Sequence, residues 1–125
     1  MLFGIIYIAV GAIGFAVTSG VGFAATSGKD LIIFEVNPLH NIVHLAVGLA
    51  LVLAARAGAQ AAKGMNAVVG GVYLIVGVLG FALVGTDANL IALNQPDNLL
   101  HLASAAVLLF LGTQTGASSP VSVRD

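Results

Sequence analysis

The stretch Leu2–Val17, LFGIIYIAVGAIGFAV, decides the fold because it is long, apolar and free of charged residues. At a rise of about 1.5 Å per residue, a helix of about this length crosses a hydrocarbon core of about 30 Å. Three further apolar runs follow, and the sequence predicts four membrane-spanning helices at about 2–18, 38–55, 65–84 and 96–113. No Lys or Arg precedes the first run, so we expect a span there and not a cleaved signal peptide.

The composition favours a membrane protein of one domain. Of 125 residues, 59% are hydrophobic and only 7% are charged, whereas about a quarter of a soluble domain is charged. So few charged side chains do not cover a water-facing surface, and we expect the lipid bilayer to be the main solvent. The net charge of −1 argues against a nucleic-acid partner. The absence of cysteine excludes disulfides, thiolate metal sites and cysteine nucleophiles.

Two motifs recur in the same order along the chain, which indicates a duplicated helical hairpin. The first is a glycine and tyrosine pattern that recurs 66 residues later: Gly4, Tyr7, Gly11 and Gly14, then Gly70, Tyr73, Gly77 and Gly80. The second is an asparagine and histidine pattern that recurs 57 residues later: Asn37, Asn41 and His44, then Asn94, Asn98 and His101.

The repeat predicts the topology. Each copy holds two spans, an even number, so the two copies share one orientation in the membrane. The predicted fold class is all-α: an integral membrane four-helix bundle made of two parallel-repeat helical hairpins, a single transmembrane domain over residues 1–125. It follows that His44 and His101 are expected at the same depth, near the non-cytoplasmic ends of their helices.

The few charges predict an orientation. Arg56 and Lys63 flank the connection between the second and third spans, and the positive-inside rule places that connection in the cytoplasm. Both termini are then cytoplasmic as well, in a multi-pass protein of the bacterial inner membrane. The segment from Leu31 to Val36 has two possible placements: in the membrane interface as a short amphipathic turn, or as a cap on the bundle.

Small and amide side chains have expected structural roles. Gly11, Gly14, Gly77 and Gly80 lie on one face of their helices and are predicted to let helices pack closely, although such a groove also suits a flat ligand or a partner helix. Asn37 and Asn94, each close to a proline, are expected to cap the second and fourth helices. With Asn41 and Asn98, they form a predicted structural polar network.

The histidines support three interpretations, because ionisable residues within spans usually face the bundle interior. The first is an interhelical hydrogen-bond network without a cofactor. The second is ligation of a haem or another tetrapyrrole by His44 and His101. The third is a zinc or copper site formed by His40, His44 and His101, with Glu35 as a further candidate ligand.

The sequence contains no recognisable catalytic arrangement, so we expect no enzyme. Its serines lack an arranged base and acid, and its glycine-rich stretches lie within the spans. The predicted role is a small structural or accessory subunit of a larger membrane complex, in contact with lipid and with other membrane subunits. The alternative is a haem- or pigment-binding protein. Transport of a small solute is a third class, which would need a continuous polar path.

The segment Phe34–His44, FEVNPLHNIVH, resembles a family of bacterial membrane proteins described as domain of unknown function 4383. The later segment 97–101, DNLLH, and the tyrosine-to-glycine pattern of the first and third spans fit the same family. The resemblance covers nearly the whole chain. It implies a four-pass membrane protein and supplies no activity.

Overall fold

The computed structural model describes residues 1–114, and in that range the fold is all-α apart from one short hairpin. This confirms the all-α part of the predicted fold class. The helices and strands, in chain order, are α1 (Leu2–Val17), β1 (Lys29–Leu31), β2 (Phe34–Val36), α2 (Pro38–Ala57), α3 (Ala59–Leu83) and α4 (Gln95–Thr113).

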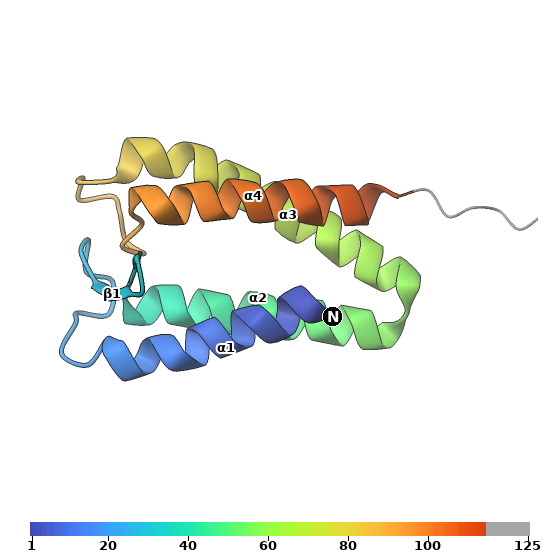
Figure 1. Ribbon diagram of the computed structural model, residues 1–125, viewed down its shortest axis with the longest axis horizontal. Helices are drawn as coiled ribbons and strands as arrows, with labels where there is room; N and C mark the ends of the chain where they lie inside the picture. Colours follow the sequence, from blue (N-terminus) through green and yellow to red (C-terminus); the bar gives the residue numbers. More distant parts are fainter. Residues whose placement is uncertain (115–125) are drawn as a thin grey trace, which may run out of the picture.

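The helices pack as two antiparallel pairs (Figure 1). α1 lies against α2, α3 lies against α4, and α2 also contacts α3. Only Gly58, at φ 126°, separates α2 from α3. α3 begins at Ala59, ahead of the predicted start at Met65, because residues 59–63 are alanine, glutamine and lysine, which favour helix. Lys63, expected in a loop, therefore lies within α3.

Asparagine caps begin two of the helices. The Asn37 carboxamide oxygen accepts a hydrogen bond from the His40 backbone N–H at 2.8 Å. The Asn94 oxygen accepts one from the Asp97 N–H at 3.0 Å. In both helices a proline occupies the first turn, where a missing N–H costs nothing.

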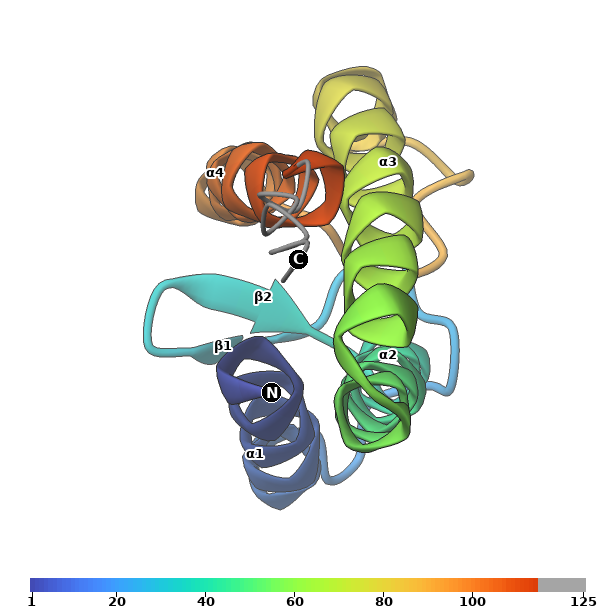
Figure 2. The ribbon, with the colours of Figure 1, turned by 90° about the vertical axis from the view of Figure 1, so that its right-hand side faces the viewer.

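The segment 29–36 forms an antiparallel hairpin, in which Leu31 pairs with Phe34. Seen along the bundle, the hairpin lies between α1 and α4, whereas α3 lies over α2 (Figure 2). β1 contacts α1, and β2 contacts α4. The turn residues Ile32 and Ile33 are exposed. The structure places this segment at one end of the bundle on the α1–α4 side, and its placement relative to the membrane interface stays a prediction.

The distribution of polarity is inverted relative to a soluble bundle. α2 and α3 are long and apolar enough to cross a membrane, and α1 is apolar but shorter. Large apolar side chains cover the outside of the helices, for example Ile75, Val78 and Phe110. The interior, in contrast, holds histidine, asparagine, aspartate and serine side chains as well as apolar ones.

Candidate functional site

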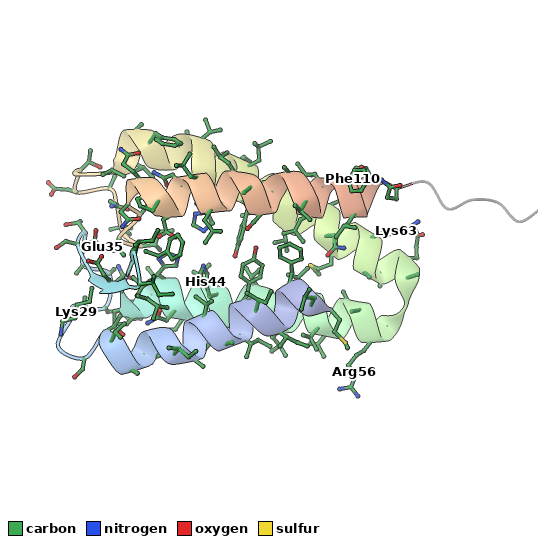
Figure 3. The ribbon with its side chains drawn as sticks, in the orientation of Figure 1. Lys29, Glu35, His44, Arg56, Lys63 and Phe110 are labelled. Atoms are coloured by element: carbon green, nitrogen blue, oxygen red, sulfur yellow. The ribbon has the colours of Figure 1, made fainter. Side chains whose placement is uncertain are left out.

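Three imidazoles meet in the interior, from two helices that are far apart in the sequence. His40 and His44 lie one turn apart on α2, and His101 comes from α4. One nitrogen of each ring lies within 4.8 Å of the others, and all three side chains are buried. Figure 3 shows His44 pointing from α2 into the space between the helix pairs. We call these residues the histidine cluster.

Within the cluster, His40 and His44 are in direct contact. Their Nε2 atoms are 3.1 Å apart, which is hydrogen-bond distance if one of the two nitrogens carries the hydrogen. The ring centroids of His44 and His101 are 6.3 Å apart, and those of His40 and His101 are 6.0 Å apart. The structure thus places the predicted pair, His44 and His101, on facing surfaces of the bundle interior.

A carboxylate stands beside the cluster. Oδ2 of Asp97 lies 3.7 Å from Nδ1 of His40, and both side chains are almost completely buried, at 2% and 1% exposure. The His40 ring therefore has one nitrogen toward a carboxylate and the other toward His44. At 3.7 Å, Nδ1 of His40 and Oδ2 of Asp97 are close but beyond hydrogen-bond distance.

The predicted glycine faces do bring helices together. A Cβ atom at Gly14 would overlap the Asn41 carboxamide, and a Cβ at Gly80 would overlap the Asn98 carboxamide. Gly11 and Gly77 lie in the same way against the backbone of α2 and α4. The four glycines thus allow α1 to approach α2, and α3 to approach α4, at the level of the two buried asparagines.

The capping asparagines also join the two helix pairs. Nδ2 of Asn37 donates to the Leu90 carbonyl oxygen at 2.8 Å, and Nδ2 of Asn94 donates to the Ile33 carbonyl oxygen at 2.9 Å. The two bonds are reciprocal, because the 57-residue offset that relates Asn37 to Asn94 also relates Ile33 to Leu90. Asn37, the cap of α2, therefore holds the loop that precedes α4, and Asn94, the cap of α4, holds the loop that precedes α2.

Several buried polar atoms lack a hydrogen-bond partner among residues 1–114. They belong to two tyrosine hydroxyls, the three histidine Nδ1 atoms, one aspartate oxygen and two carboxamides: Tyr7, Tyr73, His40, His44, His101, Asp97, Asn41 and Asn98. Buried polar groups are nearly always paired with protein, water or an ion. Tyr7, Tyr73 and Asp97 adjoin the histidine cluster, whereas the Asn41 and Asn98 carboxamides lie against Gly14 and Gly80.

A cavity of about 300 Å³ opens beside the cluster, between α1, α4 and the hairpin. Three of its polar lining residues, Tyr7, His44 and Asp97, each carry one of the unpaired atoms. The remainder of the lining is mostly apolar, as in most sites for small molecules.

Sequence reasoning missed part of this arrangement. Asp97 and Ser104 were not predicted to lie beside the histidines or the cavity. The signal for Asp97 was present, because the 57-residue offset aligns it with His40. Glu35, the further candidate ligand, is not in the cluster; its carboxylate accepts a hydrogen bond from the Gly28 backbone N–H.

A family model described as "Domain of unknown function (DUF4383)" matches residues 1–114. No curated protein and no solved structure matches the chain.

Proposed function

The chain belongs to the family of domain of unknown function 4383, and from that premise we propose a four-pass membrane protein that holds a transition-metal ion on the histidine cluster. The observation that carries the metal site is the meeting of three buried imidazoles, with one nitrogen of each within 4.8 Å of the others.

The four-pass placement is supported by the inverted polarity. Large apolar side chains face outward and polar ones face inward, which suits a hydrocarbon surrounding. α2 and α3 meet the length and hydropathy of a span. α1 and α4 pair with them in two hairpins with matching contacts, Gly14 with Asn41 and Gly80 with Asn98, as a parallel repeat requires. In the proposed orientation, Arg56 and Lys63 lie on the cytoplasmic side of the bacterial inner membrane.

The metal assignment follows from ligand chemistry. Imidazole nitrogens suit zinc and copper. A tetrahedral ion with metal–nitrogen distances of about 2.0–2.1 Å separates its ligand nitrogens by about 3.3 Å. The 3.1 Å between Nε2 of His40 and Nε2 of His44 is close to this value. Three histidines leave one coordination position for water or another ligand, and Asp97 would support His40 from behind.

The alternative with haem ligated by His44 and His101 has weaker support. A tetrapyrrole needs a wide flat space around the axis that joins its two axial imidazoles. The cavity borders His44, but His101 is not among its lining residues. His40, with Nε2 3.1 Å from Nε2 of His44, stands where the macrocycle would lie.

Metal analysis of protein purified in mild detergent tests the proposal, together with an absorption spectrum. We expect about one equivalent of zinc or copper in the native protein, and loss of that metal in His101→Ala. Tyr73→Phe is the matched control and should keep the metal. Tyr73 packs on the His101 ring at 4.9 Å between centroids, and its substitution keeps the aromatic ring. A metal-free preparation that binds neither added Zn²⁺ nor Cu²⁺ would exclude the site. A Soret band would support the haem alternative.

An accessory role in a larger complex is a second proposal, supported by the apolar outer faces and by the small size of the loops. Co-purification under mild detergent tests it. A defined partner in constant ratio is the expected result, and repeated isolation of the chain alone would oppose it.

A further inference from the structure

We infer that the ion on the histidine cluster enters and leaves on one side of the membrane only, past the carboxylates of Glu35 and Asp97. This side is the end of the bundle where α2 and α4 begin, which we call the hairpin end because the segment 29–36 lies there (Figure 1). The inference rests on the proposed metal site and deepens it, since it assigns the compartment that supplies the ion. Three observations carry it: the depth of the cluster, the charges at the two ends, and the packing between the cluster and the far end.

The histidine cluster lies close to the hairpin end. His40 is in the first turn of α2, and His44 and His101 are in the second turns of α2 and α4. Beyond His44 and His101 the two helices continue to Ala57 and Thr113, which is about 18–20 Å of helix at 1.5 Å per residue. The path between the cluster and the hairpin end is therefore the shorter one.

The charged side chains divide unequally between the two ends. Arg56 and Lys63 lie at the far end, where α2 and α3 join, and no acidic residue of 1–114 lies there. Figure 3 shows these two residues at the opposite end from Lys29 and Glu35. The hairpin end holds the acidic side chains of the described range: Asp30, Glu35, Asp87 and Asp97. Lys29 is its one basic side chain within residues 1–114, so the field attracts cations to the hairpin end and repels them from the far end.

Three of these carboxylates mark a path from the surface to the cluster. Asp30 is exposed and pairs with Glu35, which is half-buried, across the two strands. The strand that carries Glu35 contacts α4, which carries Asp97 in its first turn. Oδ2 of Asp97 lies 3.7 Å from Nδ1 of His40 and has no hydrogen-bond partner among residues 1–114. Since carboxylate oxygens bind zinc as imidazole nitrogens do, an ion has ligands along this path.

The side of the cluster toward the far end is packed with apolar groups. Tyr7 and Tyr73 pack on the rings of His44 and His101, at 5.6 and 4.9 Å between centroids. The buried residues that pack with these tyrosines are aliphatic: Leu51, Val69, Ala105 and Leu108. A divalent ion that moved in this direction would lose its water without gaining ligands, which is unfavourable. The far end is therefore closed to the ion.

Zinc exchange in membrane vesicles of opposite sidedness tests the inference. Right-side-out and inverted vesicles are prepared from cells that make the full chain and have taken up radioactive zinc. Reaction of Ala88→Cys, in the connection between α3 and α4, with an impermeant maleimide reports in which preparation the hairpin end faces outward. EDTA, which does not cross membranes, is then added outside, and vesicles with His101→Ala measure the zinc that is bound elsewhere.

We expect loss of the bound zinc where Ala88→Cys reacts, and retention where it does not. Loss from both preparations, retention in both, or loss only where the far end faces outward would each overturn the inference. Failure of the metal proposal has a different result, because the chain purified in detergent then binds no Zn²⁺ at all.

Glu35→Gln tests the acidic path. The glutamine keeps an acceptor oxygen for the Gly28 backbone N–H and removes the charge. Stopped-flow loading of the metal-free chain with Zn²⁺ at low ionic strength should be about three- to tenfold slower than in the parent, because the attraction at the entry is weakened. Arg56→Gln is the matched control, an exposed charge at the far end, and its loading rate should equal that of the parent. An unchanged rate in Glu35→Gln, or equal slowing in both variants, would overturn the assigned path.

Discussion

His40 and Asp97 occupy corresponding positions of α2 and α4, 57 residues apart, and their side chains meet in the interior with 3.7 Å between Nδ1 and Oδ2. A single position of the repeated motif thus supplies an imidazole in one hairpin and a carboxylate in the other. A strictly symmetric pair would be two imidazoles or two carboxylates, and neither would place a carboxylate, a common partner of metal-ligating histidines, beside an imidazole.

Asp97→Asn tests the importance of that pair for the proposed metal. The variant keeps the size of the side chain and removes the carboxyl group that lies beside His40. We expect the affinity for Zn²⁺ to fall about 10- to 100-fold, which is the usual effect of losing a partner of a ligating histidine. Competition with a chromogenic chelator measures the affinity. If the affinity of the variant equals that of the parent, Asp97 does not support the ligand.

The two glycines beside the buried asparagines should not tolerate a side chain. Gly14→Ala and Gly80→Ala place a methyl group on the Asn41 or Asn98 carboxamide. We expect each to lower the free energy of unfolding by about 1–3 kcal/mol, as overpacking does. The measurement is thermal unfolding in detergent.

Gly71→Ala is the control for both variants. Gly71 lies on the same helix as Gly80, and an added Cβ would meet no atom of residues 1–114 within 4 Å. We expect it to be neutral or to stabilise by up to about 1 kcal/mol, because alanine favours helix. Destabilisation of all three variants by the same amount would mean that close packing is not the cause.

Asn41 has a hydrogen-bond partner that Asn98 lacks, so we predict changes in stability of opposite sign for substitutions beside the two residues. Nδ2 of Asn41 donates to the Thr18 hydroxyl at 3.1 Å, whereas the Asn98 carboxamide has no partner within the described residues. The position that corresponds to Thr18, 66 residues later, is Val84. Thr18→Val should therefore destabilise by about 1 kcal/mol, and Val84→Thr should stabilise by a similar amount.

Thermal unfolding of these two variants, and of the double variant, measures the effect. The double variant exchanges the partners between the two hairpins, and its stability should return close to that of the parent. A loss of stability in Val84→Thr would show that the threonine hydroxyl does not reach Asn98.

The orientation can be tested by labelling, because the chain has no native cysteine. Gln60→Cys lies at the α2–α3 end, beside Arg56 and Lys63, and Ala88→Cys lies in the connection between α3 and α4. We expect an impermeant maleimide added to intact cells to label Ala88→Cys and to spare Gln60→Cys. Permeabilised cells are the control, in which both should react. The reverse pattern in intact cells would invert the topology.

Much of the helical architecture was predictable because apolar runs and capping asparagines are local signals. The all-α class and the family resemblance are confirmed. The repeat alone predicted that His44 and His101 lie at the same depth, because corresponding positions of two hairpins with the same orientation are at the same depth. The four-pass placement and the site residues stay predictions.

The hairpin and the short connector were not predictable from the same signals. Ile32, in the hairpin turn, has φ 69°, where a sequence normally provides glycine or asparagine. The local pattern therefore did not locate the turn at Ile32, although a short turn within Leu31 to Val36 was one of the two expected placements. Arg56 and Lys63 suggested a loop, yet both are good helix formers and lie in α2 and α3. The meeting of His40 with Asp97 depends on packing between helices, which composition and spacing do not describe.

The one-residue connector at Gly58 has a mechanical consequence for the bundle. α2 and α3 are joined at one end by a single residue, so the two helix pairs are held close together at that end. At the opposite end, the eight-residue hairpin 29–36 contacts α1 through β1 and α4 through β2, and Asn37 and Asn94 donate hydrogen bonds between the two pairs. Separation of the two helix pairs at that end therefore requires the hairpin contacts and both asparagine hydrogen bonds to break.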